Sequence, residues 1–338
     1  MFVFVILIVS LITARFNTIV IFTLSVYVLY AIIGFVDDVV KIKSKKKIAC
    51  GKLEKKSYLY KSDGISAPLR LCLYLIIAFV VSIFIYKFIP DINKDITIPF
   101  ISKTNVNLSF WEFVFIATFT IAIVANGVNF TDGLDTLAII PLITNFVFVA
   151  IVAYIVSRSD WSKYLLVPFS NNIAIVEVVP VISAAVGVLF AYLWFNSPPS
   201  SIIMGDSGSI GLGGFLGVLF VLLKVEFFIP IIAFVFIVEF MSSFFQMAYF
   251  KITKGKRFFK CAPIHHHFQF LMREKKIFDK KDDIRAELKD CDNLSDETLK
   301  RIARKLQNKE IDSKITWGFH ITSFILLVFT VVLYMKVR

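Results

Sequence analysis

The chain has 338 residues, of which 57% are hydrophobic and 18% are charged, and its mean hydropathy is +0.77. This composition excludes an ordinary water-soluble enzyme and a small disulfide-stabilised secreted domain. A net charge of +12 is common in nucleic-acid-binding proteins, but most lysines and arginines here lie in loops beside apolar runs. That position favours membrane topology and attraction to anionic headgroups, and it argues against nucleic acid as a partner.

Eight apolar runs are long enough for a helix to cross roughly 30 Å of hydrocarbon. They cover about residues 17–36, 68–89, 110–126, 134–157, 173–195, 207–223, 227–250 and 317–336. A ninth run, 1–14, is too short for a full crossing and is interpreted as the end of a span. The sequence therefore predicts an all-α, polytopic transmembrane helix bundle with eight full spans and one partial N-terminal span, forming a single membrane domain over residues 1–338.

The basic residues predict the orientation of the spans. Segment 41–70 holds ten lysines and arginines and segment 251–316 holds eighteen, out of 37 in the chain. Because basic residues concentrate in cytoplasmic loops, we expect both segments to be cytoplasmic. Counting the crossings between them places four polar clusters on that same face.

The first cluster, GFVDDVVK, puts Asp37 and Asp38 at the end of the first full apolar run. Two neighbouring carboxylates near a helix C-terminus are unfavourable, because they repel each other and the helix dipole, so a metal or a proton would compensate them. The alternative is a pair of solvated interfacial acids balanced by Lys41.

The second cluster, NGVNFTDGLDTLA, gathers Asn126, Asn129, Asp132 and Asp135 between two spans. Hard cations such as Mg²⁺ prefer such oxygen ligands. An Asx-rich turn that caps the next helix is the alternative, although a turn needs only one or two of these residues.

The third cluster, WFNSPPSSIIMGDSGSIGLGG, places Asp206 where a glycine-rich helix is expected to begin. A carboxylate there could be a helix cap, or could hold a metal that bridges to phosphate bound at the helix N-terminus. The glycines themselves are typical of close packing between transmembrane helices.

The fourth cluster, CAPIHHHFQ, contains three of the four histidines in the chain. Consecutive side chains diverge on a helix and alternate on an extended backbone, so these histidines are poorly placed for one tetrahedral zinc ion. Contact with phosphate or proton transfer suits them better. His320, alone in the last run, receives no role.

In this order and on one membrane face, GFVDDVVK, NGVNFTDGLDTLA, WFN with MGDSGSIGLGG, and APIHHHF closely resemble the phospho-N-acetylmuramoyl-pentapeptide-transferase family. The resemblance extends from about residue 17 onward. The wider superfamily of polyprenyl-phosphate N-acetylhexosamine-1-phosphate transferases shares the acidic motifs, whereas the uninterrupted HHH is similar to the muramoyl-pentapeptide branch.

The resemblance implies a multi-pass enzyme of the bacterial cytoplasmic (inner) membrane, with its active site on the cytoplasmic face. Such an enzyme transfers phospho-N-acetylmuramoyl-pentapeptide from its UDP carrier to undecaprenyl phosphate, forming lipid I and UMP in peptidoglycan synthesis. Its partners would be these two substrates and membrane lipids, and a homodimer stays open. The implied residues are Asp206 and Asn129 for Mg²⁺, Asp37, Asp38 and Asp206 for catalysis, and Asn129, Asp132, Asp135, Asn196, His265, His266 and His267 for substrate binding.

The chain also departs from the family pattern. The family has ten spans and a Gly/Thr-rich cytoplasmic loop before the second, and we expect this chain to lack the first span and that loop. Ile203 stands where the family usually has an aromatic residue that stacks on uracil, and Gln269 stands where it usually has Glu.

Segment 279–312 is interpreted as an inserted, cytoplasmic amphipathic helical segment. Ser295 could cap a helix whose apolar stripe comprises Leu299, Ile302, Ala303 and Leu306. The segment would be either solvated or laid on the inner leaflet.

Two alternatives to the leading function stay open. One is a related transferase that acts on another UDP-sugar. The other is a transporter, for which only Glu177 and Glu239 are candidate ionisable groups near the bilayer midplane.

Overall fold

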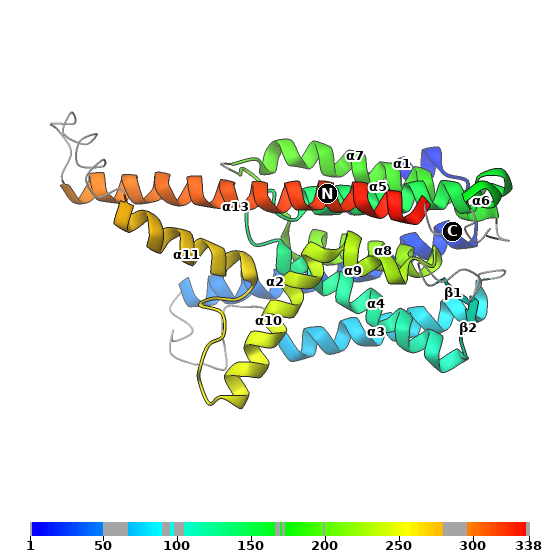
Figure 1. Cartoon of the computed structure of the whole chain (residues 1–338), viewed down its shortest axis with the longest axis horizontal. Coiled ribbons are helices and arrows are strands. Elements are labelled where there is room, and N and C mark those ends of the chain that lie inside the picture. Colours follow the sequence, from blue (N-terminus) through cyan, green and yellow to red (C-terminus); the bar gives the residue numbers. More distant parts are fainter. Residues whose placement is uncertain are drawn as a thin grey trace.

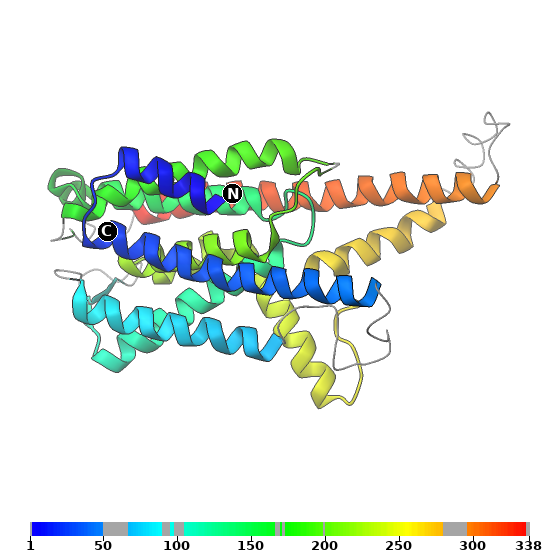
Figure 2. The ribbon, with the colours of Figure 1, turned by 180° about the vertical axis from the view of Figure 1, so that it is seen from behind.

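A computed structural model describes residues 2–49, 67–89, 95–97, 105–165, 170, 173–198, 200–279 and 296–335. Within these ranges the chain forms a bundle of long helices, most of whose axes run roughly along one direction, whereas Phe234–Ile252 runs obliquely to them (Figures 1 and 2). The elements are α1 (Phe2–Thr13), α2 (Thr18–Ala49), α3 (Ala67–Phe88), β1 (Asp95–Thr97), β2 (Asn105–Asn107), α4 (Phe110–Thr131), α5 (Ile139–Val156), α6 (Ser159–Leu165), η1 (Ile173–Glu177), α7 (Val178–Asn196), α8 (Gly205–Leu222), η2 (Glu226–Phe228), α9 (Ile229–Ile232), α10 (Phe234–Ile252), α11 (Ile264–Asp279) and α13 (Asp296–Met335).

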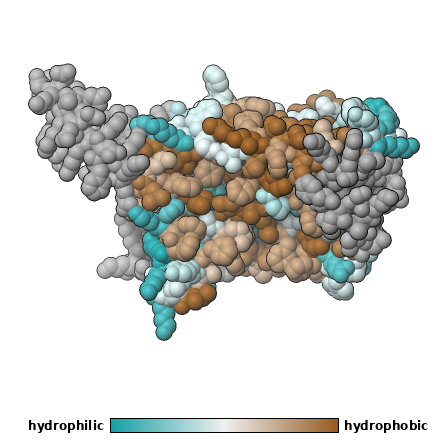
Figure 3. Space-filling view, in the orientation of Figure 1, coloured by the Kyte–Doolittle hydropathy of each residue, from teal (hydrophilic) through white to brown (hydrophobic). Residues whose placement is uncertain are grey.

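The predicted membrane bundle is confirmed. Among the described residues, eight helices are long and apolar enough to cross a bilayer, and α1, with 12 residues, is shorter than these. Figure 3 shows a broad hydrophobic surface over the middle of the bundle, with hydrophilic residues toward its two ends. The helices satisfy their backbone hydrogen bonds internally, as a chain in hydrocarbon requires.

Three details differ from the sequence prediction. The run at 227–250 is broken into η2, α9 and α10, and Pro230 lies where the short α9 begins. The run at 134–157 becomes helical only from Ile139, because 132–138 forms turns. A short antiparallel hairpin pairs Asp95 with Asn107 between α3 and α4, a non-helical element that hydrophobic periodicity did not indicate.

Helix α8 is the centre of the bundle and packs against α2 on one side and α4 on the other. It is buried along nearly its whole length. A Cβ added at Gly213 or Gly217 would lie 2.8 or 2.9 Å from the Cα of Ala125 or Ile121 on α4. The prediction that these glycines permit close helix packing is therefore confirmed.

Helix α13 is a single 40-residue helix. Its last part is the final apolar span, and its first part projects beyond the bundle on the same axis, beside α11 (Figure 1). Residues 280–295, with the proposed Ser295 cap, lie outside the described residues, as do the side chains of the apolar stripe. The backbone of 296–312 continues straight into the span and does not bend aside at its start.

Candidate active site

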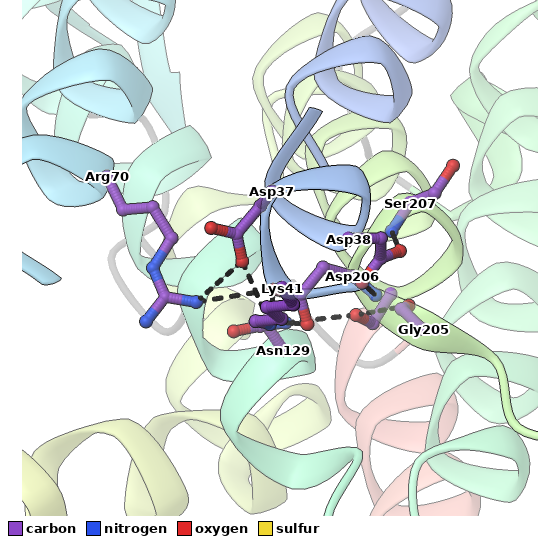
Figure 4. A network of polar contacts seen from close by, with 9 residues as sticks. Asp37, Asp38, Lys41, Arg70, Asn129, Gly205, Asp206 and Ser207 are labelled. Atoms are coloured by element: carbon purple, nitrogen blue, oxygen red, sulfur yellow. Dashed lines mark hydrogen bonds and ion pairs between the residues drawn. The ribbon is translucent and has the colours of Figure 1, made fainter. Parts of the chain in front are cut away.

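The polar clusters gather at one end of the bundle, where α2, α4, α7 and α10 finish and α8 begins (Figure 1). The sequence prediction that they share a face therefore agrees with the helix directions. At the centre of this end is the first turn of α8. The side chains that meet there come from α2, α3, α4 and α8 (Figure 4).

Asp206 is the central carboxylate. Its Oδ1 accepts a hydrogen bond from Asn129 Nδ2 at 3.1 Å. Its Oδ2 accepts from Lys41 Nζ and, at 3.2 Å, from Arg70 Nη1. The first turn of a helix favours a negative side chain because the dipole is positive there. Asp206 therefore joins α2, α3 and α4 to the start of α8.

Asp37 is fully buried and shares both of these cations. Lys41 Nζ lies 2.8 Å from its Oδ2 and Arg70 Nη1 lies 3.2 Å from the same oxygen. Two carboxylates are thus balanced by two basic groups, which is what burial of charge requires. The expectation that Asp37 and Asp38 lie near a helix end is wrong, because α2 continues to Ala49 through its lysine-rich run.

Asp38 faces the backbone of α8 (Figure 4). Its two oxygens accept the backbone N–H groups of Asp206 at 3.3 Å and Ser207 at 3.1 Å. These are among the N–H groups that a helix leaves without an internal partner at its start. The neighbouring aspartates consequently differ: Asp37 binds the cations, and Asp38 caps α8 from another helix.

Asn129 connects Asp206 to Ser209, because its Nδ2 also lies 3.1 Å from Ser209 Oγ. Asn126, one turn earlier, instead donates to the carbonyl of Ala122 in its own helix. Only one of the two asparagines therefore belongs to this network.

Asp135 and Asn196 hold two loops together next to the network. Asp135 Oδ1 accepts from Ser200 Oγ at 2.8 Å. Asn196 accepts the N–H of Thr136 at 2.7 Å and donates to the carbonyl of Ile202 at 2.9 Å. The loop after α4 is thus tied to the loop before α8. Substrate contact by either side chain stays a prediction.

His320, to which the sequence analysis assigned no role, also supports this loop. Its Nε2 lies 3.0 Å from the carbonyl oxygen of Thr136, whose φ of 63° is uncommon for a residue other than glycine. His320, in the last span, thereby contacts the loop at a residue whose backbone conformation is strained.

The three adjacent histidines lie in the first turn of α11 and point to different partners. His265 Nδ1 lies 2.9 Å from Glu239 Oε2, His266 Nδ1 lies 2.6 Å from Gln269 Oε1, and His267 Nδ1 accepts the N–H of Lys260 at 3.3 Å. The argument that they do not converge on one metal agrees with this geometry. Glu239, one of the two transporter candidates, is thus bound to a histidine.

His265 links α10 to the loop after α4. Both His265 and Glu239 are fully buried. On the other side of the ring, a Cβ added at Gly133 would lie 2.4 Å from His265 Nε2, so any larger residue there would force the buried ring to move. His265 is therefore a packing residue for the loop that contains Asp132.

His265→Ala is expected to destabilise the protein by ~3–5 kcal/mol, because it leaves the Glu239 carboxyl buried without its partner. The expected measurement is a clearly lower midpoint of thermal unfolding in detergent. His267→Ala is the control, since the His267 ring is only half-buried and accepts a long backbone hydrogen bond, at 3.3 Å, from Lys260. Equal midpoints for the two variants would contradict the packing role of His265.

Asp132 follows the last residue of α4, and its carboxyl holds its proton more tightly than a free aspartate does. Burial is the main cause that raises the pKa of Asp132 to about 8, and repulsion from Asp206 and Asp38 adds to it. The native protein therefore binds this proton more tightly than the unfolded chain, and stability falls as the pH rises from roughly 4 to about 8.

Asp132→Asn should remove this loss of stability. The stability of the variant minus that of the original chain is expected to be larger at about pH 9 than at about pH 5. Thermal unfolding in detergent at both pH values measures it. A difference between the two proteins that does not change with pH would contradict the raised pKa.

The donor set of the network is compatible with Mg²⁺. Among the described residues, no three His, Cys, Asp or Glu side chains gather as a metal site. Magnesium, however, is commonly held by one or two carboxylates together with water and substrate phosphate. Asp206, at the start of α8 with 16% of its side chain exposed, and Asn129, near the end of α4, offer oxygens of this kind.

The sequence prediction missed Arg70 and Ser209 and gave Lys41 only a balancing role. Two signals were available. Lys41 is four residues after Asp37 and so shares its helix face, and Arg70 is a charged residue near the start of an apolar span, where a partner is expected.

Comparison with known proteins gives a consistent result. The glycosyl transferase family 4 profile matches residues 57–224. A phospho-N-acetylmuramoyl-pentapeptide-transferase from Sulfurimonas denitrificans is 37% identical over 274 residues, which cover 79% of this chain and 70% of that protein. The corresponding protein from Nautilia profundicola is 37% identical over 268 residues, 79% of this chain and 71% of its own. That from Hydrogenobaculum sp. is 39% identical over 240 residues, 71% of this chain and 61% of its own.

The chain thus matches between 61% and 71% of the length of these three relatives.

Proposed function

Since the chain belongs to the phospho-N-acetylmuramoyl-pentapeptide-transferase family, we propose that it transfers phospho-N-acetylmuramoyl-pentapeptide from its UDP carrier to undecaprenyl phosphate. The products would be lipid I and UMP. The observation that carries the proposal is the convergence of Lys41, Arg70 and Asn129 on Asp206 at the start of α8.

The proposed reaction joins one phosphate to another. An oxygen of the lipid phosphate attacks the phosphorus that bears the sugar, the bond from that phosphorus to the UMP oxygen breaks, and UMP leaves. The attacking oxygen is already anionic, so positioning and charge neutralisation can supply much of the rate acceleration. We therefore favour direct attack over a covalent intermediate on an aspartate.

The basic residues of the network suit this chemistry. Lys41 and Arg70 each lie between Asp37 and Asp206, and both keep about a quarter of their side chains exposed. They can therefore contact phosphate oxygens while they hold the carboxylates. Asp38 keeps the first N–H groups of α8 in place, which orients Asp206.

Asp206 and Asn129 would hold Mg²⁺, which, when bound, would neutralise the diphosphate and stabilise the charge that develops on it. Removal of divalent cations with a chelator should abolish turnover, and added Mg²⁺ should restore it.

The uracil side of the substrate would contact a different surface from that of the family pattern. Ile203, three residues before Asp206, is 79% exposed and cannot stack as an aromatic ring does.

The orientation of the basic segments supports an active site on the cytoplasmic face of the bacterial cytoplasmic membrane.

Membranes that contain the protein, supplied with undecaprenyl phosphate and one UDP-sugar at a time, test the proposal by UMP release. We expect release with UDP-N-acetylmuramoyl-pentapeptide. Release with UDP-N-acetylglucosamine alone would instead assign the chain to another transferase of the same superfamily.

A further inference from the structure

A chain of polar side chains connects His266 to the last span. His266 Nδ1 lies 2.6 Å from Gln269 Oε1. On its other side, Gln269 Nε2 donates to Asp312 Oδ1, which belongs to α13. Gln269 is 7% exposed, whereas His266 is half-buried. The glutamine is thus fixed between the histidine and the aspartate.

The chemistry of Asp312 determines the orientation of the Gln269 amide. An ionised carboxylate accepts hydrogen bonds and donates none, so the group that faces it must be the NH₂ end of the amide. Arg273 Nη2 lies 3.6 Å from the same Asp312 oxygen, so a second donor faces this carboxylate. The carbonyl oxygen of Gln269 consequently faces His266.

The amide orientation in turn determines the histidine tautomer. Because an amide oxygen only accepts, the His266 nitrogen next to it must carry a proton. In the neutral ring the proton is therefore on Nδ1, and Nε2 is the nitrogen with a free lone pair. Among the described residues, no hydrogen bond to His266 Nε2 is formed, so this atom is available to a ligand.

We propose that Gln269 and Asp312 are positioning residues, which fix the ring of His266 so that it presents Nε2 to the phosphorylated substrate. The neutral ring offers an acceptor at that atom, and the protonated ring offers a donor to a phosphate oxygen. The substrate contact rests on the proposed function, whereas the tautomer does not.

A glutamate at position 269 would not serve in the same place. Its carboxylate would face that of Asp312, and like charges at hydrogen-bond distance repel each other. The amide at 269 and the carboxylate at 312 are therefore a matched pair in this chain, and they connect the histidine turn to the helix that also carries segment 296–312.

The tautomer can be observed directly by ¹⁵N NMR of histidine-labelled protein in detergent. The chain has only four histidines, and a His266→Gln sample identifies the signals of His266. At a pH at which the rings are neutral, we expect Nδ1 to be protonated and Nε2 unprotonated. A His266 signal from the opposite tautomer in the unmodified chain would overturn the proposal.

Variants at Asp312 separate positioning from structure. Asp312→Leu removes the acceptor and lets the amide turn, so we expect a mixture of His266 tautomers and a fall in kcat of about tenfold with little change in KM. Asp312→Asn keeps an acceptor oxygen for Gln269 and should retain both the tautomer and most of the activity.

Lys314→Gln is the matched control, since Lys314 lies on the same helix and is largely exposed, paired with Glu310. It should leave both readouts unchanged. A single tautomer in Asp312→Leu, or an Asp312→Asn protein as impaired as Asp312→Leu, would refute the positioning role. If the unmodified protein shows the expected tautomer but releases no UMP from any UDP-sugar, the proposed function fails while the assigned tautomer stands.

Discussion

Asp206→Asn is expected to lower turnover by about 100-fold or more, a loss typical of removing a group that organises charge in an active site. The amide cannot balance Lys41 and Arg70, which both contact Asp206 Oδ2, and it is a poorer ligand for Mg²⁺. The measurement is Mg²⁺-dependent release of UMP from UDP-N-acetylmuramoyl-pentapeptide in the presence of undecaprenyl phosphate.

The variant should remain folded in detergent, because Asp37 still pairs with both cations and Asp38 still caps α8. Asp160→Asn is a suitable control: this acid, in α6, is 70% exposed and pairs with Arg158 at the other end of the bundle. We expect the control to keep full activity. Undiminished Mg²⁺-dependent turnover in Asp206→Asn would remove the metal assignment.

The bundle was predictable because the bilayer imposes strong local rules. Length and hydropathy are enough to locate eight crossings, and the loop charges are enough to group the polar clusters at one end. The boundaries were less predictable where a polar sequence continues a helix. The polarity of the lysine-rich run after Asp38 is typical of a loop. Lysine is nevertheless a good helix former, and α2 continues through this run to Ala49.

The composition of the network was predictable, but its pairing was not. Asp37 and Asp38 are adjacent in the sequence, and only the packing of α2 against α8 turns one toward Arg70 and the other toward the backbone of Ser207. Such a division depends on the rotation of a helix about its axis, which an apolar run without a clear polar face does not determine.

The histidine motif shows the same limit. The divergence of three consecutive side chains follows from helix geometry alone. The partners do not follow from it, because Glu239, which contacts His265, and Asp312, which contacts Gln269, come from two other helices, 26 and 43 residues away. Sequence reasoning offered Glu239 as a candidate ionisable group of a transporter or as a residue of bundle packing or of the interface, and the structure places it in a buried contact with His265.

Gly34→Ala is expected to produce the second large effect, through the contact between α2 and α8. A Cβ at this position would lie 2.3 Å from the backbone oxygen of Asp206 and 2.6 Å from the Cα of Ser207. Neither atom can rotate away as a side chain can, so the helices must separate. A displacement on the order of 1 Å in a catalytic group can reduce the rate about 100-fold, and overpacking costs ~1–3 kcal/mol of stability.

The UMP-release assay and the midpoint of thermal unfolding in detergent measure the two effects together. Gly187→Ala is the matched control, because a Cβ there has no neighbour within 4 Å among the described residues. In the middle of α7 the added methyl group should leave activity unchanged and should not lower stability, since alanine is the better helix former. Activity of Gly34→Ala within twofold of the original chain would mean that the spacing between α2 and the start of α8 does not control the position of Asp206.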